Sequence, residues 1–435
     1  MSQVAAKAEG PARWGILALL SVVIAGNYYA YDSIAPVAEL LRSGRGFTQQ
    51  QIGLLNAVFS IPNIFLALVG GMMIDRYGPA RVSLWTAALC CVGTVATAIG
   101  SPFGLMVLGR LLFGIGEETL LIALLAGLAQ WFSTGGGTAL AMSLFFSLAR
   151  VGSYAADISP RWARDLYQHG WQPPLWLAAV ITTASLVAAI GYALVDARVR
   201  RAKGASRTTE RVSWSDIKRF DRSYWYILAL NVLFASVFFP FRSTFAIEYF
   251  QDAKGLSLEA AGLVNSWVFF AAIFATPVFG VIADKVGHRA LMMTLGTLLL
   301  PLTFVILGAT NWSLWISTAL MGISFSVVPA VIWSATAMLV EPARLGTAYG
   351  LVNVLQNVGL AACNLAAGWL NDSAAAGPAN PAGFDGMLWF FGGLGCVAFS
   401  FVALLWLREL SPQGHGLETA RLPETIEIVS ESDRT

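Results

Sequence analysis

Six charged side chains lie inside long apolar stretches of this 435-residue chain. In chain order they are Asp32, Arg110, Glu117, Glu118, Arg150 and Arg242. An arginine at the centre of a bilayer costs ~2.5–3.5 kcal/mol on insertion scales, so such residues are usually paired or functional. A guanidinium fork can bind a carboxylate, and a carboxylate can bind an ammonium group. The pattern predicts a buried site for small charged solutes.

Glu118 and Arg150 are the strongest candidates for that site. Each falls near the middle of its apolar stretch at a helical rise of ~1.5 Å per residue. The two stretches are consecutive with a short connection, so we expect the two helices to be neighbours. A zwitterion could then place its ammonium on Glu118 and its carboxylate on Arg150. The structural alternative is a buried salt bridge that locks the two helices together.

The other four charges divide between framework and gate. Neighbouring residues on a helix point about 100° apart, so Glu117 and Glu118 are expected to do different jobs, and the assignment could be reversed. Arg110 lies two turns before Glu117 on nearly the same face, and both are expected to be structural. Asp32 lies nearer the outer surface and is expected to pair with Arg242 as an outer gate. A second carboxylate anchor is the alternative role for Arg242.

Polar and aromatic side chains extend the predicted substrate site. They are Tyr28, Tyr31, Asn353, Gln356, Asn357 and Trp333. The tyrosines are three residues apart on one helical face, which suits either the wall of a cavity or an interfacial aromatic belt. The amides can bind a peptide backbone or join helices to each other, and both readings remain open. Trp333 is expected to cap the inner end of the site or to pack.

Composition indicates a membrane protein. Hydrophobic residues make up 57% of the chain and charged residues 12%, with mean hydropathy +0.66, whereas soluble domains have ~25% charged residues. Twelve apolar stretches are long enough to cross ~30 Å of hydrocarbon, and continuous apolarity predicts helices. They cover about 14–37, 52–74, 82–100, 103–131, 136–158, 174–195, 223–250, 258–282, 290–309, 312–339, 345–371 and 386–407. The predicted fold class is an all-α membrane protein with twelve transmembrane helices.

The chain divides into two matching halves. Gly71, Asp75 and Gly78 recur at a constant displacement as Gly280, Asp284 and Gly287. The predicted segments are a cytoplasmic N-terminal tail (1–13), a six-helix bundle (14–195), a basic cytoplasmic linker (196–222), a second six-helix bundle (223–408) and a disordered cytoplasmic tail (409–435). Duplicated halves with a site between them are the signature of a secondary transporter.

The repeated turns are expected to change between conformations. Each aspartate can accept hydrogen bonds from the N–H groups at a neighbouring helix start, where the helix dipole favours an anion. Basic neighbours could hold it in place; they are Arg76, Arg81, Lys285 and Arg289. An ordinary basic turn is the alternative.

These features resemble a known family. GMMIDRYGPAR (71–81) and GVIADKVGHRA (280–290) look like motif A of the major facilitator superfamily, and GRLLFGIG (109–116) resembles its fourth-helix motif. The resemblance implies two pseudo-symmetric six-helix bundles that rock about a central cavity.

A narrower resemblance rests on four stretches. They are NYYAYD (27–32), FGIGEETL (113–120), SFSVVPAVIW (324–333) and LGTAYGLVNVLQNVGLAACNLAAGWLND (345–372). Together they are similar to the dipeptide-transporting branch of the superfamily, whose animal members are lysosomal. This resemblance implies that Glu118 and Arg150 bind the two termini of the substrate.

Charge and motif content bound the partners. The net charge of +2 predicts no nucleic-acid partner, and Lys and Arg gather in segments that would then be cytoplasmic, which places both termini inside. The short N-terminal tail shows no acidic dileucine sorting signal, so we expect a bacterial plasma membrane. No metal-ligand spacing, nucleotide-binding loop or catalytic motif occurs, which predicts a non-enzyme without cofactors. The expected partners are a small solute and the lipid bilayer, and a monomer is expected to function.

The sequence therefore predicts a secondary-active or facilitative transporter. It would move small zwitterions, dipeptides first, by rocker-switch alternating access. An organic-anion or monocarboxylate carrier that uses Arg150 and Arg242 is the alternative, and a non-transporting receptor or scaffold is the alternative from another class. Whether protons are coupled to transport is open, because a buried Glu118 or Asp32 could carry one.

Overall fold

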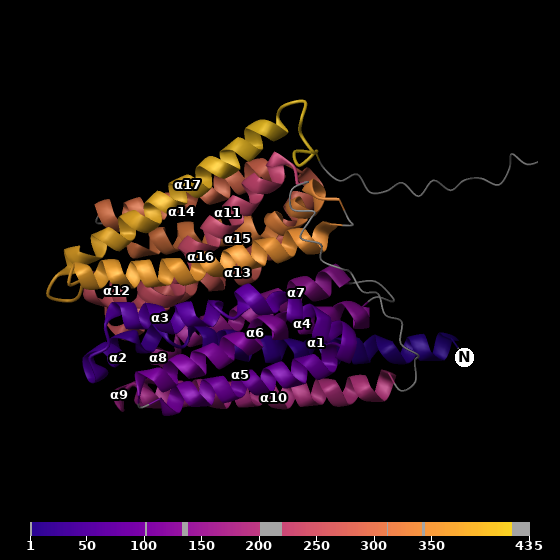
Figure 1. Cartoon of the computed structure of the whole chain (residues 1–435), viewed down its shortest axis with the longest axis horizontal. Helices are drawn as coiled ribbons and strands as arrows, with labels where there is room; N and C mark the ends of the chain where they lie inside the picture. The colour runs from indigo at the N-terminus through magenta and orange to yellow at the C-terminus, as the bar shows by residue number, and fades with distance from the viewer. Residues whose placement is uncertain are drawn as a thin grey trace, which may run out of the picture.

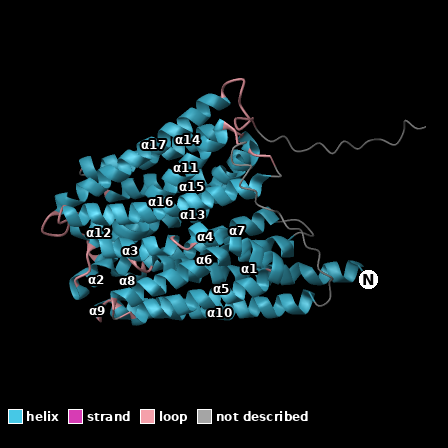
Figure 2. Ribbon diagram, in the orientation of Figure 1, coloured by secondary structure: helices cyan, strands magenta, loops and turns pink. Residues whose placement is uncertain are grey.

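A computed structural model describes residues 2–100, 102–132, 138–200, 220–310, 312–341 and 344–419. Helices dominate these residues, and the only β pairing among them is an isolated bridge between Gly377 and Asn380 (Figure 2). The linker residues 201–219 and the tail residues 420–435 lie outside the described part, as do the side chains of Asp75 and Asp284.

The first half supplies six crossings of the bundle. They are α1 (Ser2–Asp32), the pair α3 (Gln49–Ser60) and α4 (Asn63–Tyr77), α5 (Pro79–Ile99), α6 (Phe103–Phe132), α7 (Thr138–Asp157) and α10 (Gln172–Arg200). Helix α1 packs on α7 and α10, and α6 packs on α5, α3 and α4.

The second half repeats this arrangement. Its crossings are α11 (Arg222–Pro240) continued by η3 (Phe241–Phe245) and α12 (Ala246–Asp252), then α13 (Leu258–Val286), α14 (Arg289–Ala309), α15 (Leu314–Leu339), α16 (Leu345–Ser373) and α17 (Asp385–Glu409). Ten helices in the described residues are long and apolar enough to span a membrane. The two expected spans beyond these ten are the α3–α4 pair and α7.

Local sequence explains where two crossings are interrupted. Helix α3 ends at Ser60 and α4 starts at Asn63, with Pro62 between them. Proline lacks the N–H group that a continuous helix would need there. Pro240 ends α11, and the chain runs through the wider π turn of η3 before α12 begins. Such π turns are frequent at functional sites, and this one carries Arg242.

The two halves meet along two pairs of helices. In Figure 1 the first half lies below the second, and α16 and α13 face it. Helix α16 packs on α3 and α4, and α13 packs on α7. The two halves that repeat in sequence therefore meet at a pseudo-symmetric interface, in which each half contributes equivalent helices to the two contacts.

Short elements gather at one end of this interface, which we call the sealed end. They are η1 (Ala35–Val37), α2 (Ala38–Arg45), α8 (Ser159–Trp162), α9 (Arg164–Gln168) and α12. They lie at the left of Figure 1, and the opposite end, where α10 ends and α11 begins, is called the linker end. The predicted topology makes the sealed end the outer one.

Part of the tail that was expected to be disordered is packed on the second half. The Leu291 N–H donates to the Glu418 carboxylate at 3.0 Å, and the Arg289 N–H donates to the Leu417 carbonyl at 2.9 Å. The N–H groups of His415 and Leu417 donate to Glu409 at the end of α17. The prediction of disorder from residue 409 is therefore wrong as far as Thr419, because these contacts satisfy the start of α14 and bury Leu417.

Candidate functional site

Arg110 is a strut inside the first half. Its side chain is buried and donates to the carbonyls of Leu55 at 3.1 Å, Ala30 at 3.2 Å and Tyr31 at 3.3 Å, and also to the Asn56 side chain. These bonds tie α6 to α1 and α3. They support the structural role expected for Arg110, through three backbone carbonyls and one amide side chain.

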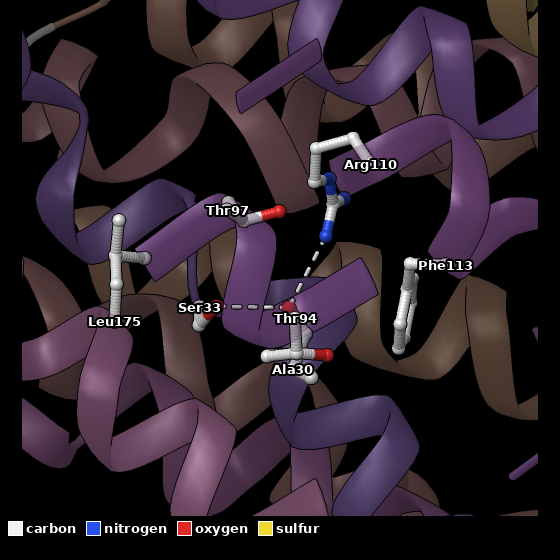
Figure 3. Close-up of a pocket in the computed structure, with 7 residues that line it drawn as sticks. All are labelled: Ala30, Ser33, Thr94, Thr97, Arg110, Phe113 and Leu175. Atoms are coloured by element: carbon white, nitrogen blue, oxygen red, sulfur yellow. Dashed lines mark hydrogen bonds between the residues drawn. The ribbon is translucent and has the colours of Figure 1, made fainter. Parts of the chain in front are cut away.

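A small pocket lies beside this strut. Its lining comprises Ala30, Ser33, Thr94, Thr97, Arg110, Phe113 and Leu175 (Figure 3). Ser33 and Arg110 both donate to the Ala30 carbonyl there. The space holds little more than one water molecule, and the donors around it are already engaged. It is too small for a zwitterionic solute.

Asp32 and Arg242 form the ion pair that the sequence suggested. Arg242 Nη1 lies 2.8 Å from Asp32 Oδ1, and Arg242 Nη2 binds a second carboxylate, Asp157. Asn265 donates to Asp157 at 3.1 Å and to the Arg242 carbonyl at 3.2 Å. All four residues are buried. Since Asp32 and Asp157 belong to the first half and the other two to the second, this cluster joins the halves.

A second cluster crosses the sealed end nearer its surface. Arg42 binds Glu248 and lies 3.2 Å from Asp252, and Gln49 Nε2 donates to Glu248 at 2.9 Å. The backbone N–H groups of Gln49 and Gln50 donate to Asp372 at 2.8 Å and 2.7 Å. The carboxylate of α16 thus caps the N-terminus of α3, where the helix dipole favours an anion.

Close backbone approaches accompany these polar contacts. A Cβ on Gly262 would lie 2.2 Å from the Asp157 carbonyl oxygen, and a Cβ on Gly53 would lie 2.4 Å from that of Asn364. Each glycine is therefore required where a helix of one half meets a helix of the other. With both ionic clusters in place, the sealed end is closed.

Glu118 faces an amide across the middle of the interface. Its Oε2 accepts from Asn353 Nδ2 at 3.5 Å, the limit of a hydrogen bond, and Asn357 donates to Asn353 Oδ1 at 3.2 Å. The Asn357 Oδ1 atom is buried without a hydrogen-bond partner. Glu118 is partly exposed, whereas Glu117 is 6% exposed. Exposure thus favours Glu118 as the acid that can meet a solute.

Arg150 lies in a cage of aromatic rings. Its Cζ atom is 4.9 Å from the ring centroid of Tyr28, 5.0 Å from that of Phe269 and 4.8 Å from that of Phe325. Cation–π attraction is effective at such distances. The Nη1 atom is buried without a hydrogen-bond partner, and in the described residues no ion pair joins Arg150 to Glu118. The buried salt bridge that would lock the two helices together is therefore not formed in this conformation.

The remaining candidates separate into three places. Tyr28 lies on the Arg150 cage, but Tyr31 packs on Phe59, with ring centroids 4.7 Å apart, and borders the Arg110 strut. Trp333 is 44% exposed and packs on Tyr349, with ring centroids 5.5 Å apart. The partly exposed Gln356 shares α16 with Asn353.

The repeated turns lie at the linker end, away from the site. Asp75 falls in the last turn of α4 and Asp284 in the last turn of α13. The neighbouring side chains of Arg76, Arg81 and Lys285 are exposed. The hydrogen bonds expected of the two aspartates lie outside the described side chains, so their clasp remains a prediction.

Sequence reasoning missed most of the seal. Asp157, Glu248 and Asp372 each lie near the end of an apolar stretch, where an acidic residue is common and attracts no notice. All three fall at the predicted outer ends of their stretches, and this shared position could have indicated a common role. Arg42, which pairs with Glu248, lies in the predicted outer loop between the first two spans.

Comparison with known proteins agrees with this architecture. The chain matches the Major Facilitator Superfamily over residues 19–247 and 228–429. It is 30% identical over 429 residues to the Lysosomal dipeptide transporter MFSD1 of Homo sapiens, which covers 95% of this chain and 90% of that relative.

Solved transporter structures share the fold. A mutant of the nucleoside transporter NupG superposes with a TM-score of 0.72 at 13% identity, covering 89% of this chain and 99% of that one. A bacterial homolog of the human lysosomal transporter Spinster, inward-facing and unoccupied, gives 0.69 at 15% identity, covering 93% and 99%.

These findings confirm the predicted fold class and the prediction that the chain is not an enzyme. They also show a multi-pass membrane protein. They do not support the expected bacterial plasma membrane, because the similar dipeptide transporter is named as lysosomal. The two matched regions together cover nearly all of both halves. The chain therefore belongs to the major facilitator superfamily of membrane transporters.

Proposed function

We propose that this protein transports small zwitterions, dipeptides in particular, by alternating access between the two sides of a membrane. The observation that carries the proposal is the unused hydrogen-bonding capacity at mid-interface. Arg150 has a buried Nη1 atom without a partner, and Glu118 has one long contact to Asn353. A cation and an acid, each on a different helix and both partly exposed, match the two ends of a zwitterion.

In this proposal the substrate carboxylate lies on Arg150, held in orientation by its aromatic cage. The substrate ammonium lies on Glu118, and the amides of Asn353 and Asn357 bind the peptide group. The name of the human relative supports dipeptides as the substrate class. Tyr31 and Trp333 are assigned no contact with the substrate, because both lie against other residues.

The closed sealed end supports alternating access. We assign the Asp32–Arg242–Asp157 cluster as its gate, and we take the linker end as cytoplasmic, with both termini inside. The alternative of an anion carrier needs Arg242 as a second anchor. In this conformation Arg242 is 0% exposed and already holds two carboxylates, which favours the gate role.

The test is uptake by purified protein in proteoliposomes. We expect radiolabelled dipeptides to enter and to raise the melting temperature of the protein. Glu118→Gln and Arg150→Ala should each abolish uptake while the unliganded melting temperature stays within a few degrees. Arg161→Ala and Asp165→Asn remove exposed charges at the sealed end and serve as controls with normal uptake.

Three outcomes would contradict the proposal. Monocarboxylate uptake that is independent of Glu118 would identify the anion carrier instead. Binding without flux would identify a receptor or scaffold. Normal uptake by either site variant would reduce that residue to packing. The same vesicles with and without an imposed pH gradient would show whether protons are coupled to transport.

A further inference from the structure

One aromatic ring contacts both the proposed substrate arginine and the gate arginine. The Arg242 Cζ atom lies 3.8 Å from the ring centroid of Phe269, and the Arg150 Cζ atom lies 5.0 Å from the same centroid. The Phe269 ring is 0% exposed. Phe325, the other second-half ring on Arg150, is 4.8 Å from it and stacks on Phe238 at 4.1 Å. Among the described contacts, Phe269 alone bridges the two arginines.

The two arginines differ in how their charge is balanced. Arg242 holds the carboxylates of Asp32 and Asp157, whereas Arg150 has no ion pair in the described part of the chain. Because both distances are measured to one centroid, the two guanidinium carbons lie within about 9 Å of each other. The gate cluster contains one cation and two acids, so it does not repel Arg150. The sealed state therefore keeps Arg150, with its Nη1 atom unused, beside the gate.

Of the two arginines that Phe269 contacts, only Arg150 belongs to the other half of the protein. Phe269 and Arg242 belong to the second half, and Arg150 belongs to the first. Rigid-body rocking of the halves would keep Phe269 with Arg242 and withdraw both from Arg150. The attraction of Arg150 to the ring is thus specific to the sealed state.

We infer that Phe269 is a positioning residue that couples occupancy of the Arg150 site to closure of the Asp32–Arg242–Asp157 gate. A substrate carboxylate on Arg150 completes its unused Nη1 donor and holds the guanidinium against the Phe269 ring. This contact stabilises the sealed state relative to the unsealed state. A ligand at mid-interface therefore favours closure of the sealed end. This inference rests on the proposed role of Arg150.

The experiment weakens the π face without changing the shape of the side chain. Phenylalanines with one, two and three ring fluorines replace Phe269 in the full-length protein, and the same series replaces Phe325 as the matched control. Spin labels at Asp165→Cys and Ala379→Cys, in a background without native cysteines, report the distance across the sealed end in detergent or nanodiscs. A dipeptide such as Ala-Ala is the ligand.

With native Phe269 we expect the dipeptide to raise the sealed population. Progressive fluorination at Phe269 should reduce that population in the absence of ligand, by up to about 10-fold in the ratio of sealed to unsealed. It should also reduce the response to the dipeptide in step. Fluorination at Phe325 should weaken dipeptide affinity through Arg150 but leave the closure that follows binding intact.

Two results would overturn the coupling. Label distances that are the same across the Phe269 series, with normal dipeptide binding, would make the ring ordinary packing. Equal effects at Phe269 and Phe325 would place the effect on Arg150 alone. If no dipeptide binds the native protein, the proposed function fails, and the ligand-free populations still decide whether Phe269 supports the seal.

Discussion

At the scale of single residues, burial of a guanidinium group is costly for each of three membrane arginines, and each has a different set of contacts. Arg110 binds backbone carbonyls, Arg242 binds two carboxylates, and Arg150 lies among aromatic rings with Nη1 unsatisfied. An unsatisfied buried donor is costly, so a protein that keeps one uses it where a ligand can complete it. The residue contacts thus distinguish a strut from the proposed gate and the proposed binding group.

Arg110→Met tests the strut. The change keeps most of the side-chain volume but leaves the carbonyls of Leu55 and Ala30 without their donor. Each such loss costs ~1–3 kcal/mol, so we expect a melting temperature lower by several degrees, on the scale of about 2 °C per kcal/mol for a long chain. Scanning fluorimetry of purified protein measures it.

Arg150→Met is the matched control for that measurement. It removes a guanidinium whose Nη1 atom makes no hydrogen bond, so its melting temperature should stay close to that of the native protein. Equal losses in the two variants would show that the distinction between strut and binding group is wrong.

At the scale of elements, helix ends at the linker end are satisfied by segments distant in sequence. Asp221 accepts from the Ser223 N–H at 3.0 Å, caps α11, and pairs with Arg408 of α17 at 2.9 Å. Glu418 receives the Leu291 N–H at the start of α14. The polar composition of the tail predicted disorder, because composition alone does not show that Glu418 can accept a hydrogen bond from the start of another helix.

Asp221→Asn tests the first of these caps. Partial burial raises the pKa of Asp221, but the N–H groups of Ser223 and Arg222 and the Arg408 guanidinium outweigh it, so the pKa lies below its ordinary value. A lowered pKa in the folded state stabilises the protein above the unfolded pKa, ~3.9, and that contribution disappears as the pH falls through the folded value.

We therefore expect Asp221→Asn to lower stability at pH 7 by less than about 1 kcal/mol, because the carboxylate is 37% exposed and solvent screens it. Melting temperatures of native and variant protein should converge as the pH is lowered below about 4. Asp165→Asn, at an exposed site on α9, should show no such dependence. A difference that persists undiminished in acid would mean that the cap acts by shape rather than by charge.

At the scale of the whole molecule, closure depends on how closely the halves approach. The seal requires Gly262 against Asp157 and Gly53 against Asn364, with no room for a side chain at either glycine. Because these contacts exist only when the sealed end is closed, small additions there should act on the balance between conformations more than on the fold of either half.

Gly262→Ala and Gly53→Ala test this dependence. Each added Cβ would meet a backbone oxygen at 2.2 Å or 2.4 Å, so the helices must separate. We expect the label distance between Asp165→Cys and Ala379→Cys to lengthen, with little loss of helical circular dichroism. Gly386→Ala, where nothing lies within 4 Å, is the control. An unchanged distance in both variants would show that the seal tolerates wider spacing.

The sequence by itself determined the membrane class, the twelve crossings, the two matched halves and the set of charges that need an explanation. It could do so because apolar length, duplication and the cost of a buried charge are local properties of the chain. It also predicted that Asp32 and Arg242 would pair, since both lie toward the same side of the membrane.

Only the tertiary structure decided which partner meets each charge. Asp157 and Asn265 reach Arg242 from different helices, and Phe269 lies between Arg242 and Arg150. Glu118 and Arg150 are near the same depth, yet each contacts other groups. Burial requires that a charge be compensated, but the compensating group can come from any helix at that depth. The packing of the two halves makes that choice, and it separates the gate from the binding group.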